Sequence, residues 1–190
     1  MPEHMHSMMP LLPGWVRLAW VMTLAVVAAV HIWHGATMAG QPRWWHGAHA
    51  AMAVSMLAMY AADPMHQRDL DRALVVVFAI ITAAIAAAAV LLARHEGRLN
   101  PLWVATGVDT AAMTYMAAVM ASPSAVQAAV TWIVVAYLGG QTLAWLLGVW
   151  DHVLAHRSSL GLSGHIGIDI RLSLAAMAAG MGYMLAAITS

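Results

Sequence analysis

Apolar residues fill most of this chain in stretches of about twenty, and short polar or turn-forming segments separate them. At a rise of 1.5 Å per residue, about twenty helical residues cross the roughly 30 Å of hydrocarbon in a bilayer. Proline, glycine, aspartate and serine stand between the stretches, where helices tend to end. The pattern predicts an all-α membrane protein with six transmembrane helices in three antiparallel hairpins, at residues 14–39, 44–62, 70–94, 101–121, 124–150 and 167–188.

The composition agrees with a chain that lies in lipid. Of its 190 residues, 63% are hydrophobic and 8% are charged, whereas a soluble domain carries about 25% charged residues. We expect one six-helix domain at residues 14–190 in a bacterial plasma membrane, preceded by a His- and Met-rich tail at residues 1–13. The net charge is zero without a basic stripe, which argues against nucleic acid as a partner. The lack of cysteine excludes disulfides and thiolate metal sites.

Four histidines are concentrated in the first predicted hairpin. His31 and His34 share one face of the first helix with Met38, and His46 and His49 share a face of the second. Strongly polar side chains within a membrane span are costly and are functional candidates by default. Because imidazole and thioether are ligands for soft and borderline metals, the pattern predicts a copper site here. The alternative is that these histidines only hydrogen-bond one another, water or the backbone.

Methionines recur at helical spacing in the second helix of each predicted hairpin. Each of these helices begins with His or Asp and then carries three methionines on a narrow arc. The three trios are Met52, Met56 and Met59; Met113, Met116 and Met120; and Met177, Met181 and Met184. If these faces converge, their uncharged thioethers could hold Cu(I) through the bilayer without a large desolvation cost. Methionine that merely fills gaps between small residues is the alternative.

Several charged or ionisable residues lie near the same end of the predicted bundle. Asp109 is about two turns into its helix, so we expect it to face inward toward a histidine or a bound cation. Asp169 is close to Arg171 in the sequence, which favours an ordinary ion pair between them. The pair His152 and His156 is typical of a solvated, amphipathic helix end.

Two resemblances accompany these patterns. With the segments HAAMAVSMLAM and MAAGMGYML, most of the chain resembles a family of uncharacterised actinobacterial membrane proteins with Met/His-rich helices. That resemblance implies no established activity and transfers no catalytic residue. The MxxxM steps Met52–Met56 and Met177–Met181 are similar to those of the eukaryotic copper-uptake transporters. Those transporters build methionine triads from three chains, whereas here three helices of one chain would supply them.

These patterns favour an integral membrane protein that binds copper at the histidines and transports or delivers Cu(I) along the methionines. Protons compete for imidazole, so we expect the affinity to fall below about pH 6.5. One alternative is a haem b-binding electron carrier, with two axial histidines from different helices. Another is an accessory subunit that meets a copper enzyme or a copper chaperone. No HExxH, phosphate-loop or nucleophile-elbow motif occurs, so an enzyme acting alone is the least favoured function, although a bound copper could support redox chemistry.

Overall fold

The computed structural model describes residues 13–61, 64–97, 99–122, 127–155 and 167–189, and all regular structure in these ranges is helical. The helices are α1 (Gly14–Thr37), α2 (Gln41–Ala61), α3 (Pro64–Glu96), α4 (Pro101–Ala121), α5 (Gln127–Leu146), α6 (Val149–Ala155) and α7 (Ile168–Thr189). Residues 1–12 of the predicted tail, and His156, lie outside the described residues.

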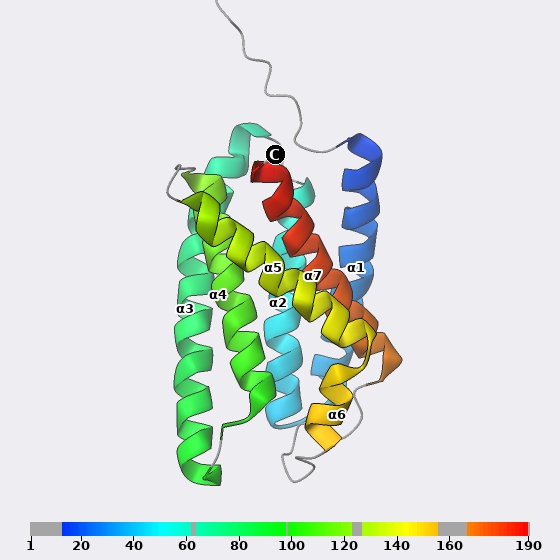
Figure 1. Cartoon of the computed structure of the whole chain (residues 1–190), viewed down its shortest axis with the longest axis vertical. Coiled ribbons are helices and arrows are strands. Elements are labelled where there is room, and N and C mark those ends of the chain that lie inside the picture. The colour runs from blue at the N-terminus through cyan, green and yellow to red at the C-terminus, as the bar shows by residue number, and fades with distance from the viewer. Residues whose placement is uncertain (1–12, 62–63, 98, 123–126, 156–166, 190) are drawn as a thin grey trace, which may run out of the picture.

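The long helices form one bundle in which consecutive helices run in opposite directions (Figure 1). The most extensive contacts join α1 to α2, α3 to α4 and α5 to α7, and α5 crosses the front of the bundle obliquely. The ends of α1, α3 and α5 therefore meet the starts of α2, α4 and α7 at one end of the bundle. We call this the histidine end, where α1 stops at Thr37 and α2 begins at Gln41.

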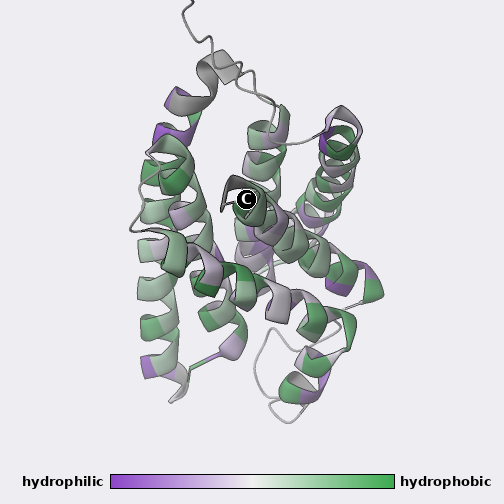
Figure 2. Cartoon of the chain, turned by 45° about the horizontal axis from the view of Figure 1, so that its top comes forward, coloured by the Kyte–Doolittle hydropathy of each residue, from purple (hydrophilic) through white to green (hydrophobic). Residues whose placement is uncertain are grey.

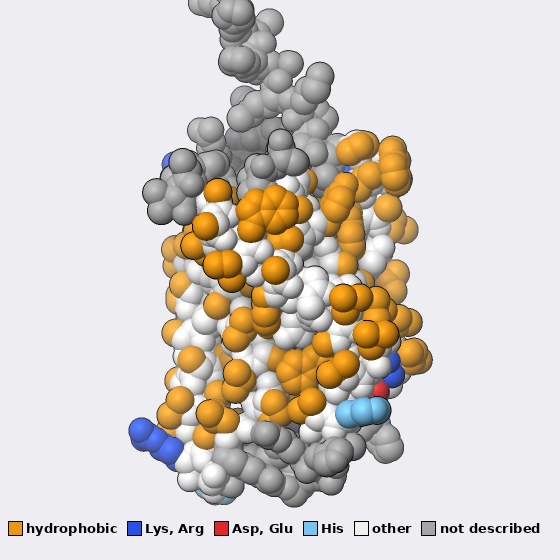
Figure 3. All heavy atoms as spheres, viewed as in Figure 1, with side chains coloured by type: hydrophobic (Ala, Val, Ile, Leu, Met, Phe, Trp, Pro, Cys, Tyr) orange, Lys and Arg blue, Asp and Glu red, His pale blue; other side chains and the backbone are white. Residues whose placement is uncertain are grey.

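Five described helices are long and apolar enough to cross a membrane. They are α1, α4 and the segments Asp69–His95, Ala128–Leu146 and Ile168–Ala187. Large apolar side chains point outward along them, and orange apolar groups cover the face seen in Figure 3. Hydrophilic residues gather mainly toward the helix ends in Figure 2. These features make the chain an integral membrane protein, because such a surface is stable in lipid and not in water.

The sixth predicted span, α2, is not among these five helices. It has 21 residues, enough to cross hydrocarbon, but its first turns contain Gln41, Arg43 and two histidines, which lower its hydropathy. Most of its polar and methionine side chains are buried between neighbouring helices. The polarity of α2 is thus directed into the bundle and away from lipid.

Three predicted helix boundaries were wrong because of proline and glycine. α2 begins at Gln41 and α3 at Pro64, earlier than expected, since proline is tolerated in the first turn of a helix. The predicted helix at residues 124–150 is broken, because α5 ends at Leu146 and Gly148 adopts a φ of 69°. This left-handed conformation suits glycine and turns the chain into α6.

Candidate functional site

The four histidines of the first hairpin lie together at the histidine end. The Nδ1 atoms of His31 and His46 are 3.0 Å apart. The ring of His31 lies 5.2 Å from that of His49, and the ring of His34 lies 5.0 Å from that of His46. His31, His46 and His49 are buried, while His34 is half-buried at the rim. We refer to these four residues as the histidine cluster.

Hydrogen bonds assign the protons in the centre of this cluster. The Ser173 hydroxyl of α7 donates to the Ile170 carbonyl at 2.8 Å, so it accepts the Nε2–H of His31 at 3.0 Å. In the neutral ring, His31 Nδ1 then carries a lone pair and accepts the Nδ1–H of His46. His46 is therefore left with a lone pair on Nε2.

The other two histidines are fixed by their own helices. The Nδ1 atoms of His34 and His49 donate to the carbonyls of Val30 and Trp45, each at 2.9 Å. In its neutral form, each of these rings carries the lone pair on Nε2. Metal-binding histidines almost always donate their second ring nitrogen in this manner, which fixes the tautomer and the ring orientation. The geometry is thus chemically suited to ligation through Nε2.

Among the described residues, Asp169 and Arg171 do not form the ion pair that we expected. Positions i and i+2 do not share a helix face, so the two side chains diverge. Asp169 Oδ2 lies 3.6 Å from His34 Nε2, and Arg171 instead meets Asp151 of α6 at 2.9 Å. A half-exposed carboxylate therefore stands at the rim of the histidine cluster.

A small cavity lies next to the histidine cluster, between α2, α4, α5 and α7. Its volume is about 10 Å³, which is space for roughly one water molecule or ion. The lining residues are His49 and Met52, Asp109, Gln141 and Trp145, and Leu174, Met177, Ala178 and Met181. One imidazole, three thioethers and one carboxylate thus line the same space. We call it the His–Met cavity.

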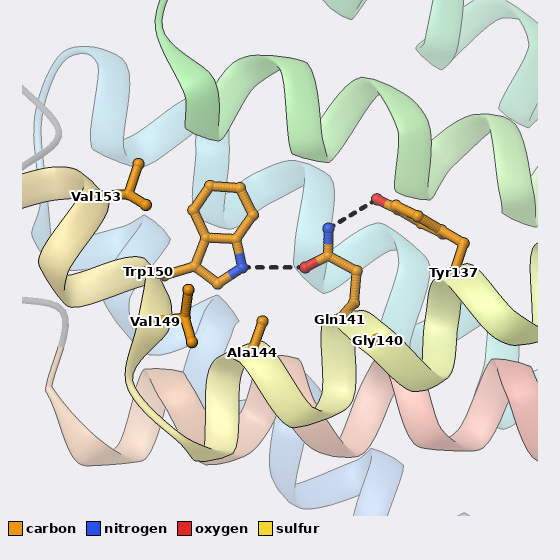
Figure 4. A pocket seen from close by; sticks show the side chains of 7 residues that line it. All are labelled: Tyr137, Gly140, Gln141, Ala144, Val149, Trp150 and Val153. Atoms are coloured by element: carbon orange, nitrogen blue, oxygen red, sulfur yellow. Dashed lines mark hydrogen bonds between the residues drawn. The ribbon is translucent and has the colours of Figure 1, made fainter.

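Asp109 is held by a chain of hydrogen bonds that the sequence analysis did not identify. The Tyr137 hydroxyl donates to Asp109 Oδ1 at 2.9 Å, and Gln141 Nε2 donates to that hydroxyl at 3.0 Å. Trp150 Nε1 of α6 donates to Gln141 Oε1 at 3.0 Å (Figure 4). Tyr137 and Gln141 are polar groups four residues apart in an apolar helix, and this spacing could have indicated a shared, functional face.

The methionines of α2, α4 and α7 are buried in one continuous core. The buried members are Met52, Met56, Met59, Met113, Met116, Met177, Met181 and Met184, and Met120 packs against them. Leucine, alanine and aromatic side chains are interleaved with these sulfur atoms. Met38 differs from the expectation, since it follows α1 in an extended conformation and leaves the helical face of His31.

Acidic and imidazole groups alone do not form a metal centre in the described residues. No three or more His, Asp or Glu side chains there are grouped so that they could hold a metal ion. A site made only of imidazoles is therefore not preformed in this part of the chain. The combination that the described residues do bring together around one space is imidazole with thioether, in the His–Met cavity.

Comparison with known proteins identifies a family of unknown function. Residues 41–188 match the family described as a domain of unknown function (DUF5134), and the chain belongs to this family. No curated protein and no solved structure matches the chain. The match includes His46, His49 and the three methionine-bearing helices, and it begins after α1. Functional inference therefore depends on the geometry of the site.

Proposed function

We propose that this member of the DUF5134 family binds Cu(I) in the bacterial plasma membrane and transports or delivers it through the methionine core. One observation carries the proposal, namely the position of His49. Its ring is 5.2 Å from that of His31 in the histidine cluster, and it also lines the His–Met cavity. The proposed imidazole ligands at the histidine end therefore lie next to the proposed thioether ligands in the interior of the bundle.

The ligand chemistry favours copper over harder cations. Thioethers are soft ligands that select Cu(I), and imidazole accepts copper as well, whereas magnesium and calcium require oxygen ligands. The sequence contains no cysteine that could bind Zn²⁺ as a thiolate. A thioether is uncharged, so a row of methionines can lie in a bilayer at little cost and still offer sulfur to a passing ion.

In this proposal α2 is a sixth crossing helix that the other helices shield from lipid. It contributes two of the four clustered histidines and the methionines Met52, Met56 and Met59 to the interior. Cu(I) enters at the histidine cluster and exchanges between neighbouring sulfur atoms of α2, α4 and α7. A copper chaperone or a copper enzyme is the partner class that such a protein would serve.

Packing in the cluster favours an ion over haem b. Axial ligation needs two histidines on opposite sides of a large, flat macrocycle. Here the rings of His31 and His46 are in direct hydrogen-bond contact, and the adjacent cavity accommodates about one water molecule. An absorption spectrum of the purified protein separates the two functions, and we expect no Soret band.

Anaerobic titration of the detergent-purified protein with Cu(I), in competition with a chromogenic Cu(I) chelator, tests the proposal. We expect His31→Ala and His49→Ala to weaken binding by at least about tenfold. His95→Ala is the matched control, because His95 is an exposed histidine near the end of α3. Wild-type protein that leaves all copper with the chelator, or equal affinities in all variants, would overturn the proposal.

A further inference from the structure

The His–Met cavity has the features of a single-ion site within the membrane. We infer that it binds one dehydrated Cu(I) through His49 Nε2 and the sulfur atoms of Met52, Met177 and Met181, with Asp109 as the counter-charge. This inference rests on the proposed function. It specifies which atoms bind the ion, how many ions bind to each chain and which ionic charge the site selects.

The cavity is too small for a hydrated ion. The cavity of about 10 Å³ is bounded by four helices, and it holds roughly one water-sized particle. An ion that enters must therefore exchange its water shell for protein ligands. The ligands must bind the ion directly, without intervening water molecules. Thioether sulfur and imidazole nitrogen can bind copper in this way.

The ring of His49 is held in a fixed orientation beside the cavity. It is buried, and its Nδ1–H is committed to the Trp45 carbonyl, which leaves Nε2 as the ligand atom. The indole ring of Trp45 lies 4.2 Å from the imidazole ring and restricts its rotation. A ligand that is oriented before the ion arrives loses less conformational entropy on binding.

The methionines complete a set of ligands from two helices. Met52 is three residues after His49 on α2, and Met177 and Met181 are four residues apart on α7, so each pair shares a helix face. All three methionines are buried and line the cavity. One nitrogen and three sulfur atoms form a neutral set of up to four ligands, which suits Cu(I).

The charge of the cavity lining determines the oxidation state of the copper ion that it binds. The proposed ligands are neutral, so a bound monovalent ion brings a single positive charge into a low-dielectric interior. Asp109 is the one acidic side chain among the residues that line this cavity. The Tyr137 hydroxyl donates a hydrogen bond that holds the Asp109 carboxylate in place. Gln141 in turn donates to that hydroxyl (Figure 4). One carboxylate balances Cu(I) or Ag(I), whereas a divalent ion would leave an uncompensated charge, which is costly in a membrane.

Isothermal titration with Ag(I), a redox-stable monovalent probe, and X-ray absorption of the Cu(I)-loaded full chain test this inference. We expect one ion per chain, sulfur in the first coordination shell, and no competition from Zn²⁺. Met177→Leu together with Met181→Leu should weaken Ag(I) binding by at least about tenfold, as should Asp109→Asn. Methionine and leucine have similar volumes, so the leucine variants should retain the fold.

Met22→Leu is the matched control, since Met22 is 60% exposed on the outer face of α1, and its affinity should equal that of the wild type. Nitrogen-only coordination, or wild-type affinity in the double methionine variant, would overturn the cavity site and leave copper binding at the histidine cluster intact. Failure of the wild-type chain to bind Cu(I) at all would overturn both proposals. Displacement of Ag(I) by Zn²⁺ would contradict the selectivity of the cavity for a monovalent ion.

Discussion

Ser173 Oγ lies 3.0 Å from His31 Nε2, across 142 positions of the sequence. This contact joins α1 to α7. It also determines which ring nitrogen carries the proton in His31 and, through His31, in His46. Because the serine accepts the Nε2 proton, His31 presents Nδ1 to His46, and His46 is left with Nε2 as a ligand atom. A hydroxyl on α7 thus sets the tautomers of histidines on α1 and α2.

Ser173→Ala should therefore destabilise the protein and weaken Cu(I) binding. It leaves the Nε2–H of a buried histidine without an acceptor, which costs about 1–3 kcal/mol in the free energy of unfolding. Thermal unfolding in detergent measures the change. Thr142→Ala is the control, since the Thr142 hydroxyl donates to the Leu138 carbonyl of its own helix. Equal losses in the two variants would contradict the role assigned to Ser173.

Gly180 of α7 lies in close contact with Met56 of α2 and Trp20 of α1. A Cβ atom there would lie 3.0 Å from Met56 Cε and 3.2 Å from the Trp20 ring. Gly180→Val should overpack this contact and reduce the free energy of unfolding by about 1–3 kcal/mol.

The matched control for Gly180 is Gly182→Ala on the same helix, where the nearest described atom to the added Cβ would be Leu138 Cβ at 3.5 Å. Alanine there should be neutral or stabilising by up to about 1 kcal/mol, because it favours the helix. Chemical unfolding curves of the two variants give the comparison. A Gly180→Val variant as stable as wild type would mean that α7 packs less closely than described.

Asp169 places a negative charge beside His34 at the rim of the histidine cluster. Asp169→Asn should slow the initial uptake of Cu(I), because the half-exposed carboxylate attracts the cation. The final number of bound ions should not change, since the buried ligands remain. Stopped-flow mixing with Cu(I) at low ionic strength measures the rate.

Asp69→Asn removes the same charge at the start of α3, at the opposite end of the bundle, where the side chain is 86% exposed. This control should leave the rate of uptake unchanged. Equal slowing by both substitutions would indicate a general effect of net charge and would contradict entry at the histidine end.

Arg171 of α7 contacts both the end of α5 and α6, and so connects these two helices. Its guanidinium donates to the carbonyls of Trp145 and Leu146 and pairs with Asp151. Lysine cannot make this fork of bonds, so Arg171→Lys should lower the free energy of unfolding by about 1–3 kcal/mol. Arg72→Lys is the control, because Arg72 forms an exposed pair with Asp69, a kind worth about 0–1 kcal/mol. Similar unfolding midpoints for both variants would contradict this role.

Local periodicity was sufficient to predict much of this architecture. Helical spacing placed His31 with His34 and His46 with His49, and the short turn between the helices brought the two pairs together. The methionine trios were expected on narrow arcs, and they share one buried core in the structure. These features depend on contacts within a helix or a hairpin, which the sequence encodes directly.

Features that depend on distant contacts could not be predicted in this way. In the sequence, Ser173 cannot be told from any other small residue of an apolar helix, because its partner His31 lies far away along the chain. In the same way, the sequence does not indicate that Tyr137 is the partner of Asp109. Met38 was lost from the predicted face because the helix ends one residue before it. The partner of Asp169 was misidentified because closeness in sequence does not make two side chains share a face.

Anomalous X-ray scattering from crystals of the full chain soaked with Cu(I) would locate the bound ion. We expect a strong copper peak in the His–Met cavity, among the side chains of His49, Met52, Met177 and Met181. Copper peaks confined to exposed histidines such as His95 and His152, with none in the cavity or at the histidine cluster, would contradict this expectation.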